Sequence, residues 1–387
     1  MGEYITDVLN IGSTKLTNMT MAAATELRAP AVGIMGIGYK SGESIAASIA
    51  AGEGGQFYPN VIDVLQDQGY INQLAYSLWL NDLDSLTGSI LFGGVDTAKY
   101  HGDLIAVPVQ LDSETDAFTS FTVAWTGLSF TSCGKTLDLS PSAAVPAILD
   151  SGTSDLLLPD EIANQVFNGL GVITDVNYGN LIKCSVLNDA GTFSFTFGGQ
   201  GGPTINVSLS EFGFPLANQD GTPAQFSDGS FACQLGIQAA GQDPILFGDT
   251  FLRAAYVVYD LQANSIALAQ TNFNATDSNI QAFPSSGGIP GASTTVSAVT
   301  VTQTNTIRIL PSASPTFPGG TGGVVGTSRS ATFALCSATG SAGSAGSSKS
   351  NAAAPGLGAS AFDASTIVAG VVALTSFVFG GGLMVFL

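Results

Sequence analysis

The sequence predicts an all-β protein built from two related lobes. Gly, Ser, Thr and Ala are abundant and charged residues make up only 10% of the 387 residues, a composition typical of β-rich secreted proteins. Short apolar runs alternate with turn residues from residue 3 to residue 38. The pattern apolar-apolar-Gly occurs in Ile34-Met35-Gly36 and again in Leu246-Phe247-Gly248, which indicates an internal duplication. The length is sufficient for two lobes and further segments.

The elements follow from hydrophobic periodicity and from turn residues. Helical spacing of apolar residues predicts a helix from Asn60 to Gly69, and acidic residues in a first turn favour a second helix from Asp160 to Leu170. Phe193, Phe195 and Phe197 alternate with small polar residues, which predicts a half-buried strand whose aromatic side belongs to the core. The other strands are expected at residues 73–79, 89–92, 104–109, 121–128, 144–149 and 265–270.

The charge balance excludes several classes of function. The formal net charge is −19 and no cluster of Lys or Arg exists to meet phosphates, so nucleic-acid binding is not expected. The chain has four cysteines without a C-x-x-C pair and a single histidine, His101, which makes a zinc site improbable. We interpret His101 as an exposed loop residue, and neither a Ser/His/Asp nor a Cys/His mechanism has the residues that it needs.

The stretch from Ala147 to Ser154 carries the candidate chemistry. The apolar run Ala147-Ile148-Leu149 leads into Asp150-Ser151-Gly152-Thr153-Ser154, which places a carboxylate at the end of a buried strand. Gly152 allows close backbone approach, and the two hydroxyls beside it can hydrogen-bond the acid and its surroundings. Two such carboxylates facing each other share a proton, one acting as base and one as acid, and so activate water against a peptide bond. We interpret Asp155 and Asp160 as solvated turn or cap carboxylates.

Four stretches together resemble the pepsin-like aspartic endopeptidases, in particular the fungal yapsin-like, cell-surface branch. They span roughly residues 2–270 in the family's order and are residues 33–38, 87–96, 150–154 and 245–260. The resemblance implies a bilobal, all-β acid protease fold that acts on protein or peptide substrates as a monomer, without metal or organic cofactor. It implies that Asp150 is one catalytic acid, that Ser151 clasps the two catalytic loops together and that Thr153 bonds the outer oxygen of Asp150.

The resemblance also implies a disulfide between Cys184 and Cys233, while Cys133 and Cys336 remain unassigned. The family has two Asp-(Thr/Ser)-Gly motifs and this sequence contains one, at Asp150. We therefore expect the first lobe to be incomplete and the chain to be truncated at its N-terminus, without its signal peptide. The alternative is a non-catalytic surface protein that retains the scaffold. A homodimer with one Asp from each chain is rejected, because residues 2–100 already resemble part of a first lobe.

Composition changes beyond the predicted lobes. We expect residues 1–108 to form a partial first lobe, 109–273 the second lobe, 274–350 a disordered Ser/Thr/Gly/Ala-rich stalk and 351–387 an attachment signal. The apolar tail from Ile367 to Leu387 has no charge and no residue after it, which favours a GPI anchor over a single span. Asn351 is the preferred attachment residue, with Ser350 and Ser348 as alternatives. N-glycosylation motifs occur at three asparagines and agree with secretion to the cell surface: Asn18, Asn206 and Asn274.

Overall fold

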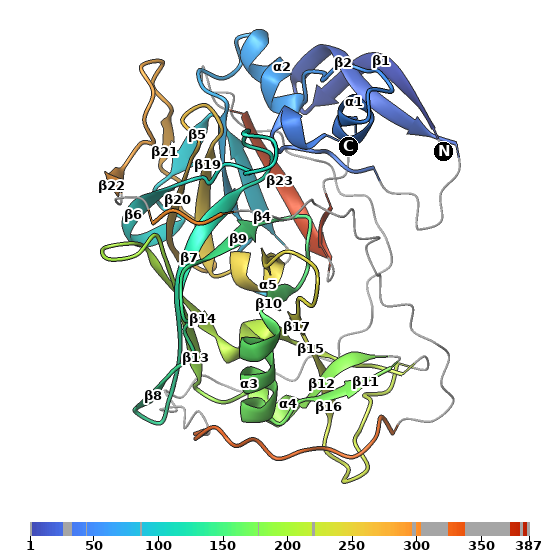
Figure 1. Ribbon diagram of the computed structural model, residues 1–387, viewed down its shortest axis with the longest axis vertical. Helices are drawn as coiled ribbons and strands as arrows, with labels where there is room; N and C mark the ends of the chain where they lie inside the picture. The colour runs from blue at the N-terminus through green and yellow to red at the C-terminus, as the bar shows by residue number, and fades with distance from the viewer. Residues whose placement is uncertain are drawn as a thin grey trace.

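Strands dominate the architecture, with two large sheets through the middle of the molecule and smaller units towards its two ends (Figure 1). The structure is a computed structural model and describes residues 2–25, 33–43, 45–85, 87–176, 178–218, 221–295, 299–302, 324–336, 372–379 and 382–384. The helices in this part of the chain are short, so the predicted all-β class is confirmed.

The central sheet brings together segments that are far apart in the sequence. Its strand order is β22-β6-β20-β19-β3-β4-β23-β24. Along β3 and β19 successive side chains alternate between two separate hydrophobic clusters, so this sheet is buried on both faces. Its strands are β3 (Ala75–Trp79), β4 (Gly88–Phe92), β6 (Tyr100–Pro108), β19 (Ala255–Asp260), β20 (Ser265–Thr271), β22 (Ala292–Thr295), β23 (Val372–Phe379) and β24 (Gly382–Met384).

A second large sheet carries the Asp150 segment. The order is β14-β13-β7-β9-β18-β10-β17, and β8 (Lys135–Asp138) pairs with β7. Phe193, Phe195 and Phe197 are each no more than 1% exposed, so the predicted core stripe is confirmed. The strands in this order are Thr204–Ser208, Thr192–Phe197, Thr122–Ser132, Val145–Leu149, Leu246–Phe247, Leu156–Leu158 and Ile237–Ala239.

A four-stranded sheet and four helical segments complete this half of the molecule. Helix α3 (Asp160–Leu170) ends as predicted, with Gly171 in the left-handed conformation at φ 74°. The predicted disulfide between Cys184 and Cys233 is present and ties α4 (Cys184–Leu187) to β16. The remaining elements are β11 (Ile173–Asp175), β12 (Gly179–Lys183), β15 (Gly213–Pro215), β16 (Ala232–Leu235), η2 (Leu209–Phe212) and α5 (Asp249–Leu252).

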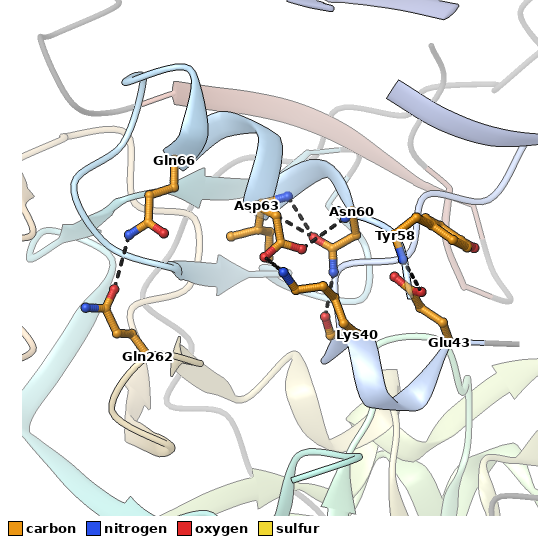
Figure 2. Close-up of polar contacts among 9 residues, drawn as sticks. Lys40, Glu43, Tyr58, Asn60, Asp63, Gln66 and Gln262 are labelled. Carbon is orange, nitrogen blue, oxygen red and sulfur yellow. Dashed lines mark hydrogen bonds and ion pairs between the residues drawn. The ribbon is translucent and has the colours of Figure 1, made fainter. Parts of the chain in front are cut away.

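The N-terminal segment forms a long hairpin with short helices beside it (Figure 1). Figure 2 shows how Asn60 starts the predicted helix α2 (Val61–Asp67): its side chain accepts hydrogen bonds from two backbone amides of the first turn and donates one to the carbonyl of Gly38. This bond fixes the end of the glycine-rich stretch at residues 33–38. The other elements here are β1 (Gly2–Ile11), β2 (Thr14–Ala24), η1 (Lys40–Gly42) and α1 (Ala46–Ala50).

Several segments within the expected stalk are packed against the rest of the protein, including β22 of the central sheet. Strand β21 (Ile280–Ala282) pairs with β5 (Gly94–Asp96), and the Phe283 side chain after it is fully buried. Residues 280–283 within the expected stalk 274–350 are therefore packed against the sheet. A few apolar side chains suffice here because the neighbouring sheet supplies the rest of the core. The average composition of a long segment does not reveal such isolated contacts.

Residues 324–336 form another packed segment, a strap along the lower edge of the molecule in Figure 1. Phe333 stacks on Phe130 with ring centroids 5.0 Å apart, and its backbone amide bonds the carbonyl of Gly169. At the end of the strap Cys336 forms a disulfide with Cys133, which pairs the two unassigned cysteines. None of the helices in the described part of the chain is long and apolar enough to cross a membrane. The preferred attachment residue Asn351 lies outside the described residues.

Replacing both Cys133 and Cys336 by serine is expected to lower the free energy of unfolding by about 2–4 kcal/mol. The reason is that this disulfide joins residues 203 positions apart and so restricts the unfolded chain. Urea denaturation of the oxidised variant, with Cys184–Cys233 intact, measures the effect. An unchanged midpoint and slope would show that the strap does not contribute to the folded state.

Candidate active site

Asp150 follows the last residue of β9, in the interior of the second large sheet. Strand β9 lies between β7, which runs antiparallel to it, and β18, which runs parallel. The Asp150 backbone amide donates a hydrogen bond of 3.1 Å to the carbonyl of Phe247. Buried strands on both sides therefore fix the point at which the carboxylate leaves the sheet, while its side chain is partly exposed.

Both oxygens of the Asp150 carboxylate accept hydrogen bonds from the same short loop. The Gly152 amide donates to Oδ1 at 2.9 Å, and the Thr153 hydroxyl donates to Oδ2 at 2.7 Å. A Cβ on Gly152 would lie 3.1 Å from Oδ1, so a larger residue at this position would crowd the carboxylate. The loop thus orients the acid, and the hydroxyl of Thr153 has the contact that the sequence predicts for it.

The loop is held from behind by residues 248–250. The amides of Gly248, Asp249 and Thr250 donate to the carbonyls of residues 155, 153 and 154, at 3.2, 2.8 and 3.1 Å. A Cβ on Gly248 would lie 2.2 Å from the Thr153 carbonyl oxygen, so glycine is required for this close approach. The second apolar-apolar-Gly segment therefore supports the loop directly, an arrangement that its sequence pattern alone does not reveal.

The two serines of the motif differ in what the structure shows for them. Ser154 contributes its backbone carbonyl, which accepts the Thr250 amide. The Ser151 side chain is half-buried, and its clasp to a second catalytic loop stays a prediction. Asp160 begins α3 and accepts a hydrogen bond of 2.8 Å from the Gly241 amide, so it joins the helix to the loop after β17.

Aromatic side chains surround the base of the Asp150 loop. Tyr76 and Tyr259 stack with centroids 4.7 Å apart, and the Tyr259 hydroxyl donates to the Leu149 carbonyl at 3.4 Å. Burial, followed by the nearby charge of Asp150, raises the pKa of Tyr259. Burial is also the main cause that raises the pKa of Tyr76, to which Tyr259 and Asp150 add. Both phenols stay neutral. The sequence placed Tyr76 in an expected strand and Tyr259 in a stretch that resembles the family, with no role for either side chain.

A second set of acids lies on the inner side of the loop. Asp249 is 3% exposed, and burial together with the charges of Asp150 and Asp155 raises its pKa to about 8, although Arg253 opposes this shift. Burial also raises the pKa of Asp155, against the opposing effects of a hydrogen bond from Gln238 and of Arg253. Asp155 is thus half-buried and hydrogen-bonded to Gln238, whereas we expected a fully solvated turn residue. It is drawn inward because its backbone carbonyl accepts the amide of Gly248.

A buried ion pair completes this set. The Arg253 Nε lies 3.1 Å from Oε2 of Glu211, and both side chains are less than one-tenth exposed. Arg253 also donates from Nη2 to the Glu211 carbonyl, and its guanidinium lies 5.6 Å from the Phe214 ring centre. Burial raises the pKa of Glu211, while Arg253 counteracts the shift.

The other predicted residues lie away from the loop. His101 is exposed as expected, but it belongs to β6 rather than to a loop and pairs with Gln270. The three glycosylation motifs also lie at the surface, since Asn18, Asn206 and Asn274 are all exposed. Among the described residues no group of three or more His, Cys, Asp or Glu side chains is arranged to hold a metal ion.

The fold and the Asp150 loop together define an aspartyl protease scaffold: a strand-end aspartate, held by a glycine amide and a threonine hydroxyl, between buried sheets. The sequence matches the family described as eukaryotic aspartyl protease over residues 1–271. The chain belongs to this family, as its resemblance to pepsin-like enzymes predicted.

Individual relatives support the same assignment. The chain is 40% identical over 322 residues to the probable aspartic-type endopeptidase OPSB of Trichophyton verrucosum, which covers 82% of this chain and 63% of that protein. It is 32% identical over 330 residues to aspartic proteinase 3 of Saccharomyces cerevisiae, covering 82% of this chain and 55% of the relative. The chain thus spans less than two thirds of the length of these relatives.

A solved structure supports the fold independently. The aspartic proteinase from Irpex lacteus superimposes with a TM-score of 0.55 at 22% sequence identity, over 71% of this chain and 78% of that one. The pepsin-like class of the fold is therefore confirmed.

Replacing Arg253 by methionine is expected to lower the free energy of unfolding by about 3–5 kcal/mol, because Glu211 would be left buried without its counter-ion. Urea denaturation at pH 6 measures the loss. Lys183→Met is the matched control, since Lys183 pairs with the more exposed Asp228 at 2.7 Å and its loss should change stability much less. Equal effects of the two substitutions would contradict the importance assigned to the buried pair.

Proposed function

We propose that the protein is an aspartic-type endopeptidase in which Asp150 is one of two catalytic carboxyl groups. The observation that carries this proposal is the pair of hydrogen bonds from Gly152 and Thr153, which orient both oxygens of a partly exposed carboxylate at a strand end. Membership of the aspartyl protease family and the names of the relatives support it. Its substrates would be proteins or peptides.

The proposed reaction is hydrolysis by general acid/base catalysis. A water molecule held between Asp150 and a second carboxyl group would lose a proton to the ionised acid and attack the peptide carbonyl. The neutral acid would donate its proton to the carbonyl oxygen, and no covalent intermediate forms. Thr153 and Gly152 would keep the Asp150 carboxylate in the orientation that this exchange requires, while Ser151 would link the two loops.

The second carboxyl group has to face Asp150 from the open side of the site. Asp249 cannot take this role, since it is almost fully buried behind the loop. The 387-residue sequence has one Asp-(Ser/Thr)-Gly motif, and its match covers 63% of the Trichophyton relative, so the activity is proposed for the whole protein. The same observation favours the alternative function, a non-catalytic surface protein on a protease scaffold.

We further propose that the protein acts at the fungal cell surface, attached by a GPI anchor. Two disulfides and three exposed glycosylation motifs support passage through the secretory pathway. Another relative, 39% identical over 285 residues, is named secreted aspartic protease 3 of Candida albicans. The apolar C-terminal tail after Asn351 supports attachment to a membrane. Residues 1–108 and 109–273 are the proposed lobes.

Asp150→Asn in the full-length protein is expected to abolish peptide cleavage, because an amide cannot accept the proton of the attacking water. Cleavage of a protein substrate at pH 4 measures the loss, and circular dichroism checks the fold. Asp116→Asn is the control: Asp116 is exposed and has a φ of 53°, which asparagine tolerates. Activity retained in the Asp150 variant would refute the assignment. An inactive wild-type protein would favour the non-catalytic alternative.

Phosphatidylinositol-specific phospholipase C is expected to release the protein from intact cells, because this enzyme cleaves the lipid of a GPI anchor and leaves a transmembrane segment in place. Asn351→Gln should divert the protein from the membrane fraction, since it removes the proposed attachment residue. Asn164→Gln is the control for loss of an asparagine, because Asn164 is exposed on α3 and lies outside the glycosylation motifs. Immunoblotting of medium and membranes reports both. Protein that stays membrane-bound after the lipase would indicate a single-span anchor.

A further inference from the structure

Behind the Asp150 loop, three carboxyl groups surround a single guanidinium. Asp249 and Arg253 are each 3% exposed, Glu211 is 6% exposed and Asp155 is half-buried. They come from α5, from the residue after it, from η2 and from the segment before β10. The proposed reaction uses none of these groups, so their arrangement requires another explanation.

Arg253, the one basic residue in this set, is already paired with Glu211. Arg253 bonds the Glu211 side chain through Nε and the Glu211 carbonyl through Nη2, and the Phe214 ring lies against it. Asp155 accepts a hydrogen bond from the neutral amide of Gln238. Asp249 has no comparable partner: its Oδ1 is buried without a hydrogen bond in the described structure.

The charged groups that act on Asp249 do not compensate it. Asp150 and Asp155 lie at the ends of β9 and β10, Tyr259 of β19 is neutral, and Arg253 is the one basic group among them. If all three inner acids were ionised, Asp249 would be a buried negative charge without a counter-ion, next to the half-buried charge of Asp155. Burying an ionised carboxylate in this way is far more costly than keeping it protonated.

Asp249 is also the residue through which the loop is held. Its amide donates to the Thr153 carbonyl at 2.8 Å, next to the threonine whose hydroxyl orients Asp150, and its neighbours Gly248 and Thr250 bond residues 155 and 154. A charge that appeared on Asp249 would face Asp150 and Asp155 across this contact. The resulting repulsion would act on the loop that carries the proposed catalytic acid.

We propose that Asp249 carries a proton in the folded protein, and that this proton keeps residues 248–250 seated against the Asp150 loop. Asp249 is thus a positioning residue, and its proton makes the second lobe a structure suited to acidic medium. Raising the pH removes the proton and loosens the support of the loop from behind. This inference goes beyond the proposed function and does not depend on catalysis.

The pKa shift of Asp249 agrees in direction and defines the pH range. Burial is the main cause that raises the pKa from the ordinary value of 3.8 to about 8. A carboxyl group whose pKa rises on folding stabilises the folded state fully below its unfolded pKa and loses this effect as the pH rises through its folded pKa. Stability should therefore decline from about pH 4 to about pH 8, and the contribution of Asp249 should be absent above that range.

The first test counts protons. At pH 6, unfolding of the wild-type protein should release about one more proton than unfolding of Asp249→Asn, because asparagine reproduces the neutral acid but has no proton to release. The slope of unfolding stability against pH gives this number, and a pH indicator in weak buffer gives it directly. Asp116→Asn, the same change at an exposed site, should release as many protons as the wild type. Equal release by wild type and Asp249→Asn would overturn the proposal.

A second measurement needs no variant to fold. The infrared spectrum of the wild-type protein should contain the C=O band of a buried, protonated carboxylic acid at pH 6, and the band should disappear as the pH passes about 8. Its absence at pH 6 would also overturn the proposal. Hydrogen exchange of backbone amides tests whether the proton keeps residues 248–250 in place. The protection factors of Gly248 and Thr250 should fall over the same pH range in the wild type and stay constant in Asp249→Asn. A constant protection in both would refute the link to the loop.

Discussion

The close contact between residues 153–155 and 247–250 is the constraint on which the rest of the second lobe depends. Three backbone hydrogen bonds join these two segments, and a fourth runs from the amide of Asp150 to the carbonyl of Phe247. The contact is so tight that Gly248 has no room for a side chain. Because Phe247 lies in the aromatic core, with ring centroids 4.8 Å from Phe251 and 5.5 Å from Trp125, the position of the carboxylate is coupled directly to core packing.

The same contact explains why acidic groups are buried in a protein with few charges. Bringing 248–250 against the loop carries Asp249 and Asp155 inward with their backbones, whether or not their side chains find partners. The chain offers Arg253 as a counter-ion, but Glu211 engages it. The backbone contacts thus bury the Asp249 carboxyl group, and among the described residues no basic side chain is left to pair with it. The proposed proton on Asp249 removes the charge that would otherwise be buried there.

Local sequence patterns predicted the elements whose causes are local. The helix predicted from Asn60 to Gly69, the alternating phenylalanines of β13 and the turn after Asp150 each depend on residues close in sequence, and the structure contains all three. The Cys184–Cys233 pair was predicted from the resemblance to a family. What escaped prediction depends on contacts between distant parts of the chain: the burial of Asp155 by Gly248, the burial of Phe283 beside β5, and the strap that joins Cys336 to Cys133. The local sequence of one segment does not show which distant segment it contacts.

The Cys133–Cys336 disulfide also changes what a proteolytic cut does to the molecule. The bond spans 203 residues, which include the whole Asp150 loop and its support. Any single cleavage of the chain between these two cysteines therefore leaves the products covalently joined, with the lobe still linked to whatever follows Cys336. A nicked molecule would migrate as one species on a non-reducing gel and as two after reduction. For a protease proposed to act at the cell surface, the disulfide would hold the two fragments together after the backbone is cut.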